Sequence, residues 1–248
     1  MIRIQGLRKQ LGTKQVLDGV DLEIESGETM VVMGRSGTGK SVLLRHIIGL
    51  MKPDAGSIQI DGQEIVGLGE RELNRIRLRF GMLFQSSALF DSLSVGGNVG
   101  LALQDKLGMS EPDVQKRVAE RLEWVGLSGN EAMKPSSLSG GMRKRVGLAR
   151  AIAMDPEFIL YDEPTTGLDP VTADAINRLI RSMQRRMQVT SVVVTHDMTS
   201  AFHVGDRLAM LHEGRVVFRG TPEEMRSTKD PLVRQFVEGT SEGPIQVL

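Results

Sequence analysis

Apolar and polar positions repeat along the chain with two different periods. Segments 2–7 and 19–24 alternate between apolar and polar residues, which is typical of strands with one buried face. Other apolar runs are short and unbroken, as in strands that are covered on both faces. These runs are residues 29–34, 80–85, 157–162 and 190–195. The pattern therefore predicts a sheet with both central and half-exposed strands.

Segments with helical spacing separate these runs. The clearest covers residues 110–126, where Ser110 is the expected N-cap, Pro112 lies in the first turn and Gly126 ends the helix. Further helices are expected at 40–50, 139–155 and 170–187, and a hairpin is expected at 207–220.

Strands that alternate with helices predict an α/β fold, with a mixed core sheet flanked by helices and an antiparallel β part near the N-terminus. Residues 91–138 are rich in helix formers and interrupt this alternation. We expect them to form a helical subdomain, which the helix over 139–153 continues. The core sheet, its helices and this subdomain are together expected to form one domain over residues 1–238, followed by a short C-terminal tail over 239–248.

Composition narrows the range of partners. Of 248 residues, 40% are hydrophobic, which is enough for a substantial core. Lys plus Arg and Asp plus Glu each number 31, so the net charge of +0 gives no electrostatic reason to expect nucleic acid as a partner. Cysteine is absent, which excludes disulfides and thiolate metal sites.

Membrane targeting is not indicated by the hydropathy pattern. The first ten residues lack the apolar core of a signal peptide. No apolar run approaches the roughly 20 residues that span a bilayer. We therefore expect a cytoplasmic protein, and if it serves a membrane, it does so from the cytoplasmic face of the inner membrane.

Residues 34–41 read GRSGTGKS and fit G-x-x-x-x-G-K-[ST], between an expected strand and an expected helix. Glycines let backbone N–H groups curl around phosphate oxygens, and the helix N-terminus adds positive partial charge. Lys40 is expected to reach the β- and γ-phosphates of a nucleotide, and the Ser41 hydroxyl to bind Mg²⁺. The alternative is a glycine-rich turn with an incidental lysine. The expected nucleotide-binding residues here are Gly34, Arg35, Ser36, Gly37, Thr38, Gly39, Lys40, Ser41 and Val42.

Two adjacent carboxylates, Asp162 and Glu163, end the apolar run 157–162. Their mutual repulsion gives no stability, so a function is expected. Asp162 can bind Mg²⁺, and Glu163 can then orient and deprotonate a water molecule against the γ-phosphate. The alternative is an exposed turn before Pro164.

Four more motifs follow the family order of the ABC-transporter ATPases. LSGGM at 138–142 resembles their signature motif, and Gln85 resembles the glutamine of their Q-loop. Asp169 in TGLDP resembles the D-loop aspartate, and His196 after VVVT resembles the switch histidine. With the phosphate loop and the acid pair, the resemblance covers nearly the whole chain and implies a P-loop NTPase fold of the ABC type.

The resemblance implies a head-to-tail homodimer with two ATP molecules and Mg²⁺ at the interface. Glu163, His196 and Gln85 would then be the catalytic residues. Ser41, Gln85 and Asp162 would be the metal ligands. Ser139, Gly140, Gly141 and Asp169 would contact nucleotide, and the first three lie at a positive helix end that suits an anion. The alternative for the signature is a glycine-rich helix cap.

The chain departs from the family pattern at two places. Leu11 stands where the family usually has an aromatic residue that stacks on adenine, and no aromatic lies near it. Leu11 is expected to offer the base an apolar platform without stacking, and Val16 is also expected to contact the nucleotide. Binding should depend mostly on the phosphates, which leaves ATP-over-GTP selectivity open. Met142 stands where the signature usually has Gln, so an amide donor is lost.

Within the family, three features resemble the Mla/Mce-type branch of phospholipid-trafficking transporters. They are the GGM of the signature, the stretch LFDSLSVGGNVGLALQ and the ending VRQFVEGTSEGPIQ. This resemblance implies transport of phospholipid between inner and outer membranes. It also implies three partners: an integral membrane permease, an Mce-domain lipid-binding subunit and a STAS-domain regulator. The permease would dock on the apolar loop Ala88, Leu89, Phe90 and Leu93, unless that loop packs under the helical subdomain.

Three other readings compete with this one. The first is an ABC ATPase of an importer or exporter for another cargo. The second is a non-transport ABC ATPase that works on DNA or ribosomes, for which the chain has neither sustained heptads nor a basic balance. The third is a P-loop kinase, which would need an acceptor pocket and no signature motif.

Overall fold

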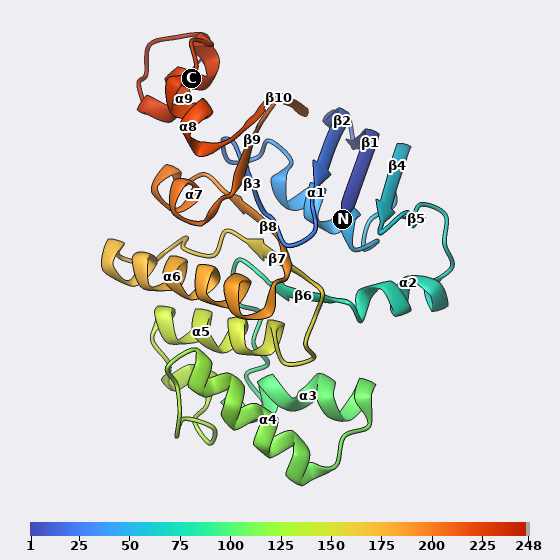
Figure 1. Ribbon diagram of the computed structural model, residues 1–248, viewed down its shortest axis with the longest axis vertical. Helices are drawn as coiled ribbons and strands as arrows, with labels where there is room; N and C mark the ends of the chain where they lie inside the picture. Colours follow the sequence, from blue (N-terminus) through green and yellow to red (C-terminus); the bar gives the residue numbers. More distant parts are fainter. Residues whose placement is uncertain (247–248) are drawn as a thin grey trace. The chain divides into compact units, whose positions relative to one another are not determined.

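The computed structural model describes residues 1–246, and its contacts divide the chain into two compact units (Figure 1). Unit 1 combines residues 1–73 with the part of the chain from Val192 onward, and unit 2 comprises residues 74–191. No helix within residues 1–246 has the length and apolarity that crossing a bilayer requires.

Unit 1 contains the predicted antiparallel part near the N-terminus. Strands β1 (Ile2–Leu11), β2 (Lys14–Ile24), β4 (Ala55–Ile60) and β5 (Gln63–Glu64) form a sheet in the order β2-β1-β4-β5. Ile2 faces Ile24 on one side and Ile60 on the other, and all three side chains are fully buried. The alternation along residues 2–7 and 19–24 thus supplies the apolar face of this sheet.

A mixed sheet forms the core of unit 1. Strand β3 (Thr29–Met33) pairs in parallel with β9 (Arg207–His212), which pairs antiparallel with β10 (Arg215–Gly220). On the other side of β3 lies β8 (Thr190–Thr195), whose first two residues belong to unit 2. Helices α1 (Lys40–Ile47), α7 (Met198–Val204), α8 (Pro222–Ser227) and α9 (Pro231–Glu238) also belong to this unit. Every residue of β3 is buried, as its unbroken apolar run predicts.

The end of the chain packs back onto α9. The Gln235 side chain donates to the Ile245 carbonyl oxygen at 3.0 Å and accepts from the Ile245 N–H at 2.6 Å, and Ile245 is buried. The next residue, Gln246, offers its carbonyl oxygen to the Arg35 guanidinium at 3.0 Å. The tail, which the sequence leaves loosely patterned, is therefore held at two points up to residue 246.

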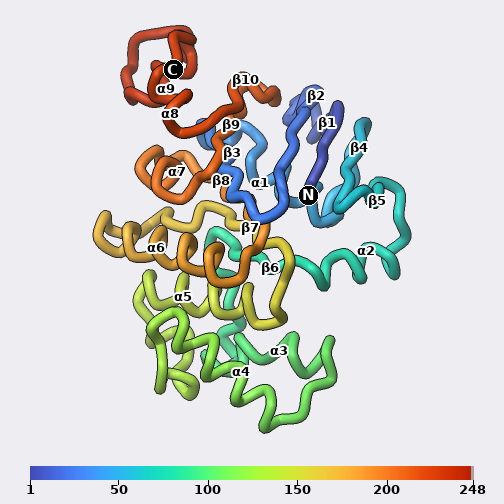
Figure 2. The backbone as a smooth tube through the Cα atoms, viewed as in Figure 1, coloured from blue at the N-terminus to red at the C-terminus, as the bar shows by residue number. Residues whose placement is uncertain are grey.

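Unit 2 combines two parallel strands with a group of helices (Figure 2). Strands β6 (Phe80–Leu83) and β7 (Phe158–Asp162) pair in register, and the rings of Phe80 and Phe158 stack with centroids 4.8 Å apart. The helices are α3 (Val95–Leu107), α4 (Glu111–Trp124), α5 (Gly140–Ala151) and α6 (Pro170–Met187), with a 3₁₀ turn at Pro135–Ser137. Helix α2 (Glu70–Arg77) crosses from unit 1 into unit 2.

The predicted helical insertion is present as α3 and α4, which contact each other and α5. Ser110 is the N-cap of α4, and Gly126 follows the end of that helix with a φ of 70°. The expected helix over 40–50 is shorter than predicted, since α1 ends at Ile47.

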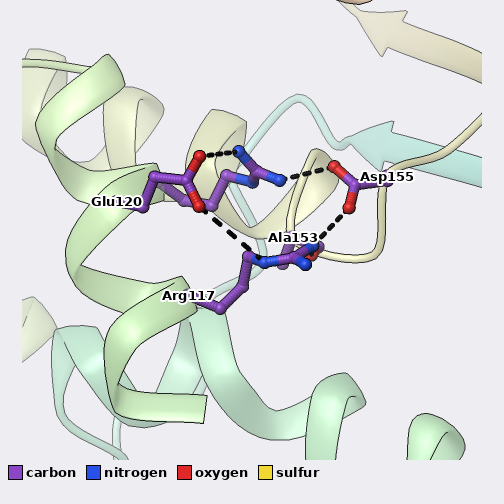
Figure 3. A network of polar contacts seen from close by, with 5 residues as sticks. Arg117, Glu120, Ala153 and Asp155 are labelled. Carbon is purple, nitrogen blue, oxygen red and sulfur yellow. Dashed lines mark hydrogen bonds and ion pairs between the residues drawn. The ribbon is translucent and has the colours of Figure 1, made fainter. Parts of the chain in front are cut away.

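A polar network joins α4 to the turn after α5 (Figure 3). Arg117 and Arg121 both form ion pairs with Asp155, and Arg117 also donates to the Ala153 carbonyl oxygen at 3.3 Å. Glu120 accepts from Arg121 at 3.1 Å. The Arg121 side chain is almost fully buried, so this network sits at the edge of the core of unit 2.

Replacing Arg121 by Met is expected to lower the free energy of unfolding by about 1–3 kcal/mol, because a buried network loses its central cation. Arg121 also lies 4.0 Å above the Trp124 ring, and that contact is lost as well. Urea titration of purified protein measures the change. The control is Arg178→Met, which breaks an exposed pair with Asp174 and should cost no more than about 0.5 kcal/mol. Equal stability of the two variants would contradict the expectation.

Candidate functional site

The phosphate loop in unit 1 connects β3 to α1, and two of its glycines cannot carry a side chain. Gly34 has a φ of 155°, and a Cβ there would lie 2.3 Å from the Leu211 carbonyl oxygen. Gly39 has a φ of 103°, and its Cβ would lie 2.9 Å from the Val16 carbonyl oxygen. The loop is therefore held tightly against two strands, and only glycine fits at these positions.

Lys40 places a positive charge inside the phosphate loop. Its side chain is buried, and Nζ donates to the carbonyl oxygens of Gly34 at 2.7 Å and Arg35 at 3.0 Å. The N-cap of α1 is Gly39, which has no side chain to bond the first turn. A cation, a helix N-terminus and a glycine loop together suit a phosphate group.

A hollow of about 420 Å³ lies beside this loop. It is lined by the β2 residues Lys14, Gln15 and Val16, by Arg35, Ser36, Gly37 and Thr38, and by His212, Glu213 and Gly214. Val16, predicted to contact the nucleotide, is therefore in the lining. Leu11 is 41% exposed and does not line the hollow. The β9–β10 turn, which the sequence did not single out as functional, forms one wall.

His196 follows β8 at the surface of unit 1 and is exposed. Asp197 caps α7 by accepting from the Thr199 N–H at 3.0 Å, and Ser200 donates to the same carboxylate at 2.6 Å. The cap fixes the backbone immediately after His196.

In unit 2, Asp162 is the last residue of β7 and Glu163 follows it, and each is only 7% exposed. The alternative of an exposed Asp-Glu turn is therefore wrong. Glu163 has a left-handed backbone with a φ of 49°, and its carboxylate accepts from the Thr166 hydroxyl at 3.0 Å. Two buried acids at a strand end form a compact set of oxygen donors.

Lys144 on α5 lies beside this acid pair. Its Nζ donates to the carbonyl oxygens of Gln85 at 2.5 Å and Glu163 at 3.1 Å. Burial lowers the pKa of Lys144, and the negative charges of Asp162 and Glu163 oppose that shift. The cation therefore partly balances two carboxylates that would otherwise repel each other.

The signature residues form the start of α5. Ser139 is the exposed N-cap, and its hydroxyl accepts from the Met142 N–H at 3.2 Å. Gly140 and Gly141 follow, and a Cβ at Gly141 would lie 2.6 Å from the Thr172 methyl group. The segment is therefore a glycine-rich helix cap. It also leaves the N-terminus of α5, a helix of twelve residues, near the surface.

Asp169, predicted to contact nucleotide, caps α6. Its carboxylate accepts from the Thr172 hydroxyl at 2.6 Å and from the N–H groups of Val171 and Thr172 at 3.0 Å each. The bond from the Thr172 hydroxyl, followed by those from the backbone, lowers the pKa of Asp169.

The residues predicted to hold magnesium offer the right chemistry. Asp162 supplies carboxylate oxygens, Ser41 a hydroxyl and Gln85 an amide oxygen, and Mg²⁺ prefers such hard oxygen ligands. Across the described residues, no group of three or more His, Cys, Asp or Glu side chains gathers as a metal site. A metal at Asp162 would therefore depend on non-acidic protein oxygens, phosphate oxygens and water, which is the usual surrounding of Mg²⁺.

The family described as ABC transporter matches residues 17–166, which include the phosphate loop, Gln85, the signature and the acid pair. The chain belongs to the ABC transporter family. It is the ATP-binding subunit of such a transporter, as its relatives also indicate.

Several relatives of this ABC ATPase subunit match almost its whole length. The probable ribonucleotide transport ATP-binding protein mkl of Mycobacterium leprae is 42% identical over 98% of this chain and 70% of that protein. The intermembrane phospholipid transport system ATP-binding protein MlaF of Haemophilus influenzae is 39% identical over 99% of this chain and 93% of that protein. The protein trigalactosyldiacylglycerol 3 of Arabidopsis thaliana is 41% identical over 99% of this chain and 76% of that protein.

A solved structure confirms the predicted fold of the ABC ATPase. It is the dimeric post-hydrolysis state of the ATP-binding cassette MJ0796 bound to ADP and Pi. That chain superposes with a TM-score of 0.82 at 35% identity, covering 90% of this chain and 99% of that one. The family match and the MlaF relatives confirm the resemblance to ABC-transporter ATPases and to the branch that contains MlaF.

The ABC ATPase also contains site-adjacent residues that sequence reasoning missed, above all Lys144 and Thr166. Lys144 could have been noticed, because the spacing of α5 puts it on the same buried face as Gly141, Leu148 and Ala151. A lysine on the apolar face of a helix is unusual unless it has polar partners. Thr166 gave no such signal, because it lies in a loop.

The apolar loop after Gln85 is accessible. Phe90 is 53% exposed, Ala88 is exposed, and Leu89 and Leu93 are half-buried. The alternative that this loop packs away under the helical subdomain is therefore wrong for Phe90. An exposed phenylalanine between two partly exposed leucines is a candidate contact for another protein.

Proposed function

We propose that the chain hydrolyses ATP between two head-to-tail copies of itself and drives phospholipid transport between membranes through a permease. The observation that carries the catalytic part is the buried acid pair at the end of β7, with Glu163 in a left-handed backbone conformation. A glutamate in a rare conformation at a family motif supports a functional role, since a stability role would not require that strain.

Each candidate residue has a proposed task. Lys40 and the backbone of Gly34 to Ser41 bind the β- and γ-phosphates. Glu163 orients the attacking water and accepts its proton, while Gln85 and His196 position that water and the γ-phosphate. Ser139, Gly140 and Gly141 bind the γ-phosphate held by the other copy. Bound Mg²⁺, ligated by Ser41, Gln85 and Asp162, would offset the charge that develops on the phosphate oxygens.

Phospholipid is proposed as cargo because two groups of relatives are named for lipids. These are the MlaF proteins and the trigalactosyldiacylglycerol protein. The mkl protein of Mycobacterium leprae, named for ribonucleotide transport, is 42% identical and thus at least as similar as the lipid-named relatives, so ribonucleotide is the second candidate cargo. The proposed assembly includes an inner-membrane permease, an Mce-domain lipid-binding subunit and a STAS-domain regulator, with this chain on the cytoplasmic face.

Purification of the complex from native membranes tests this assignment. The complex is reconstituted in donor vesicles that carry fluorescent phosphatidylethanolamine, and transfer to acceptor vesicles is followed after MgATP is added. ATP-dependent transfer is expected. ATP-dependent uptake of a ribonucleotide in the same preparation, without lipid transfer, would replace phospholipid by the second cargo.

Changing Leu89 or Phe90 to Asp is expected to abolish transport by the reconstituted complex, because a charge replaces an apolar contact with the permease. Nucleotide binding and thermal stability of the isolated subunit should stay within error of the wild type. Val217→Asp is the control, since Val217 on β10 is similarly exposed at 41% and lies outside the loop. Full transport activity in Phe90→Asp would rule out this loop as the docking surface for the permease.

A further inference from the structure

The signature helix α5 contains two cations that bond main-chain carbonyls of the loop after β6. Lys144 bonds the Gln85 carbonyl oxygen, and Arg150 bonds those of Ser87 at 2.7 Å and Ala88 at 2.6 Å. Lys144 is only 5% exposed. Burying a lysine is unfavourable unless its ammonium group is hydrogen-bonded, so Lys144 depends on these carbonyl partners.

The backbone held in this way is unusual. Ser87 and Ala88 have φ angles of 64° and 44°, and Glu163 has a φ of 49°, all in the left-handed region. Non-glycine residues in that region are uncommon and persist only when the surroundings fix them. Lys144 and Arg150 hold both strained segments in place, because Lys144 bonds the Glu163 carbonyl and Arg150 bonds those of Ser87 and Ala88.

Helix α5 also approaches this loop very closely. A Cβ at Gly147 would lie 2.6 Å from a methyl carbon of Leu83 and 3.4 Å from the Ser87 Cβ. Gly147 therefore lets the helix lie directly against the loop, between the two cations. The three residues form one continuous contact along the side of α5.

We propose that Lys144 is a positioning residue of the ATPase, which links the signature helix to Gln85 and Glu163 through their main-chain carbonyls. This inference rests on the proposed ATP hydrolysis. Lys144 does not touch substrate in this role. It sets the backbone from which the water-activating carboxylate and the Q-loop amide project.

The geometry gives this link a direction. Helix α5 starts at Gly140, about one helical turn before Lys144. A phosphate bound at the start of the helix would restrain the helix, and Lys144 would pass that restraint to Glu163. Hydrolysis in one copy would then be fast only when the signature of that same copy engages the nucleotide held by the other copy. Binding of ATP to the phosphate loop would not need Lys144.

The test is Lys144→Met, measured by steady-state hydrolysis of MgATP by the purified complex. Methionine fills similar space but donates no hydrogen bonds. The kcat is expected to fall by about 10- to 100-fold with KM within about twofold of wild type, because misplacement of a catalytic group by about 1 Å costs this much. Lys144→Arg is expected to restore at least half of the wild-type kcat, because a guanidinium can reach two carbonyls.

Arg145→Met is the matched control. Arg145 is the next residue on the same helix and also bonds a carbonyl oxygen, that of Val125 at 3.0 Å. Its kcat should equal the wild-type value. If Lys144→Met fails to fold, Lys144→Gln takes its place, since the shorter amide cannot bond both carbonyls, and about a tenfold loss of kcat is expected.

Three results would overturn the role of Lys144. They are an unchanged kcat in Lys144→Met (or in Lys144→Gln, where that is used), a raised KM with unchanged kcat, or a loss of kcat in Lys144→Arg as large as in Lys144→Met. These results presuppose a wild-type complex that hydrolyses ATP. A wild-type complex without ATP turnover would instead remove the proposed function itself, so the two failures are distinguishable.

Discussion

Replacing Glu163 by Gln is expected to lower kcat for ATP hydrolysis by at least about 1000-fold, while ATP still binds. General-base catalysis contributes about 10²–10⁴-fold to such reactions, and an amide cannot accept the proton. Gln keeps the size of the side chain and can keep the Thr166 contact, so the left-handed backbone at residue 163 should survive. The loss is therefore one of chemistry and not of folding.

Because ATP then persists, the variant should accumulate as an ATP-bound dimer. Hydrolysis is measured by phosphate release, and dimerisation by size-exclusion chromatography with and without MgATP. Glu157→Gln is the control, since Glu157 lies just before β7 and pairs with Arg79 at the surface. If Glu163→Gln keeps its turnover, Glu163 is not the base. If it stays monomeric with ATP, the sandwich of two copies fails.

Replacing Lys40 by Ala is expected to raise the Kd for ATP by at least about 100-fold. Hydrogen bonds to charged groups are worth about 1.5–3 kcal/mol each, and every 1.4 kcal/mol corresponds to tenfold in affinity. Nζ of Lys40 is already placed in the loop by the Gly34 and Arg35 carbonyls. The cation is thus organised before phosphate arrives, and its removal takes away both charge and donor.

Binding is measured by the fluorescence of a labelled ATP analogue displaced by ATP. The control is Lys229→Ala, an exposed lysine in the loop before α9, which should bind ATP with unchanged affinity. Loss of a buried cation could also relax the loop, so the melting temperature of both variants is recorded. Wild-type affinity in Lys40→Ala would mean that the phosphates bind elsewhere.

The parts of the site that the sequence predicts well are local ones. Gly34 to Ser41 follow a buried strand directly, and Asp162 and Glu163 end another, so a few consecutive residues define each motif. Strand runs and glycine spacing are encoded within about ten residues, and folding preserves them.

What the sequence could not predict depends on long separations. Lys144 bonds carbonyls that lie 59 and 19 residues away in the chain, and no periodicity encodes such pairs. The hollow beside the phosphate loop is a second feature that the sequence could not predict, because residues far apart in the chain line it. Its β9–β10 wall is more than 170 residues away from the loop in sequence, and Val16 lines it where Leu11 does not. Predicting these contacts requires the sheet order.

The restraint on the C-terminal tail has a practical consequence for work with this protein. Because Arg35 of the phosphate loop holds the Gln246 carbonyl oxygen, an affinity tag fused after Leu248 would begin only two residues beyond an atom anchored at that loop. A tag at the amino end would also disturb a contact, since the Met1 ammonium bonds Asp61 at 2.6 Å. A fusion there would replace that charge by an amide. An internal tag at the exposed Gly108 turn avoids both ends.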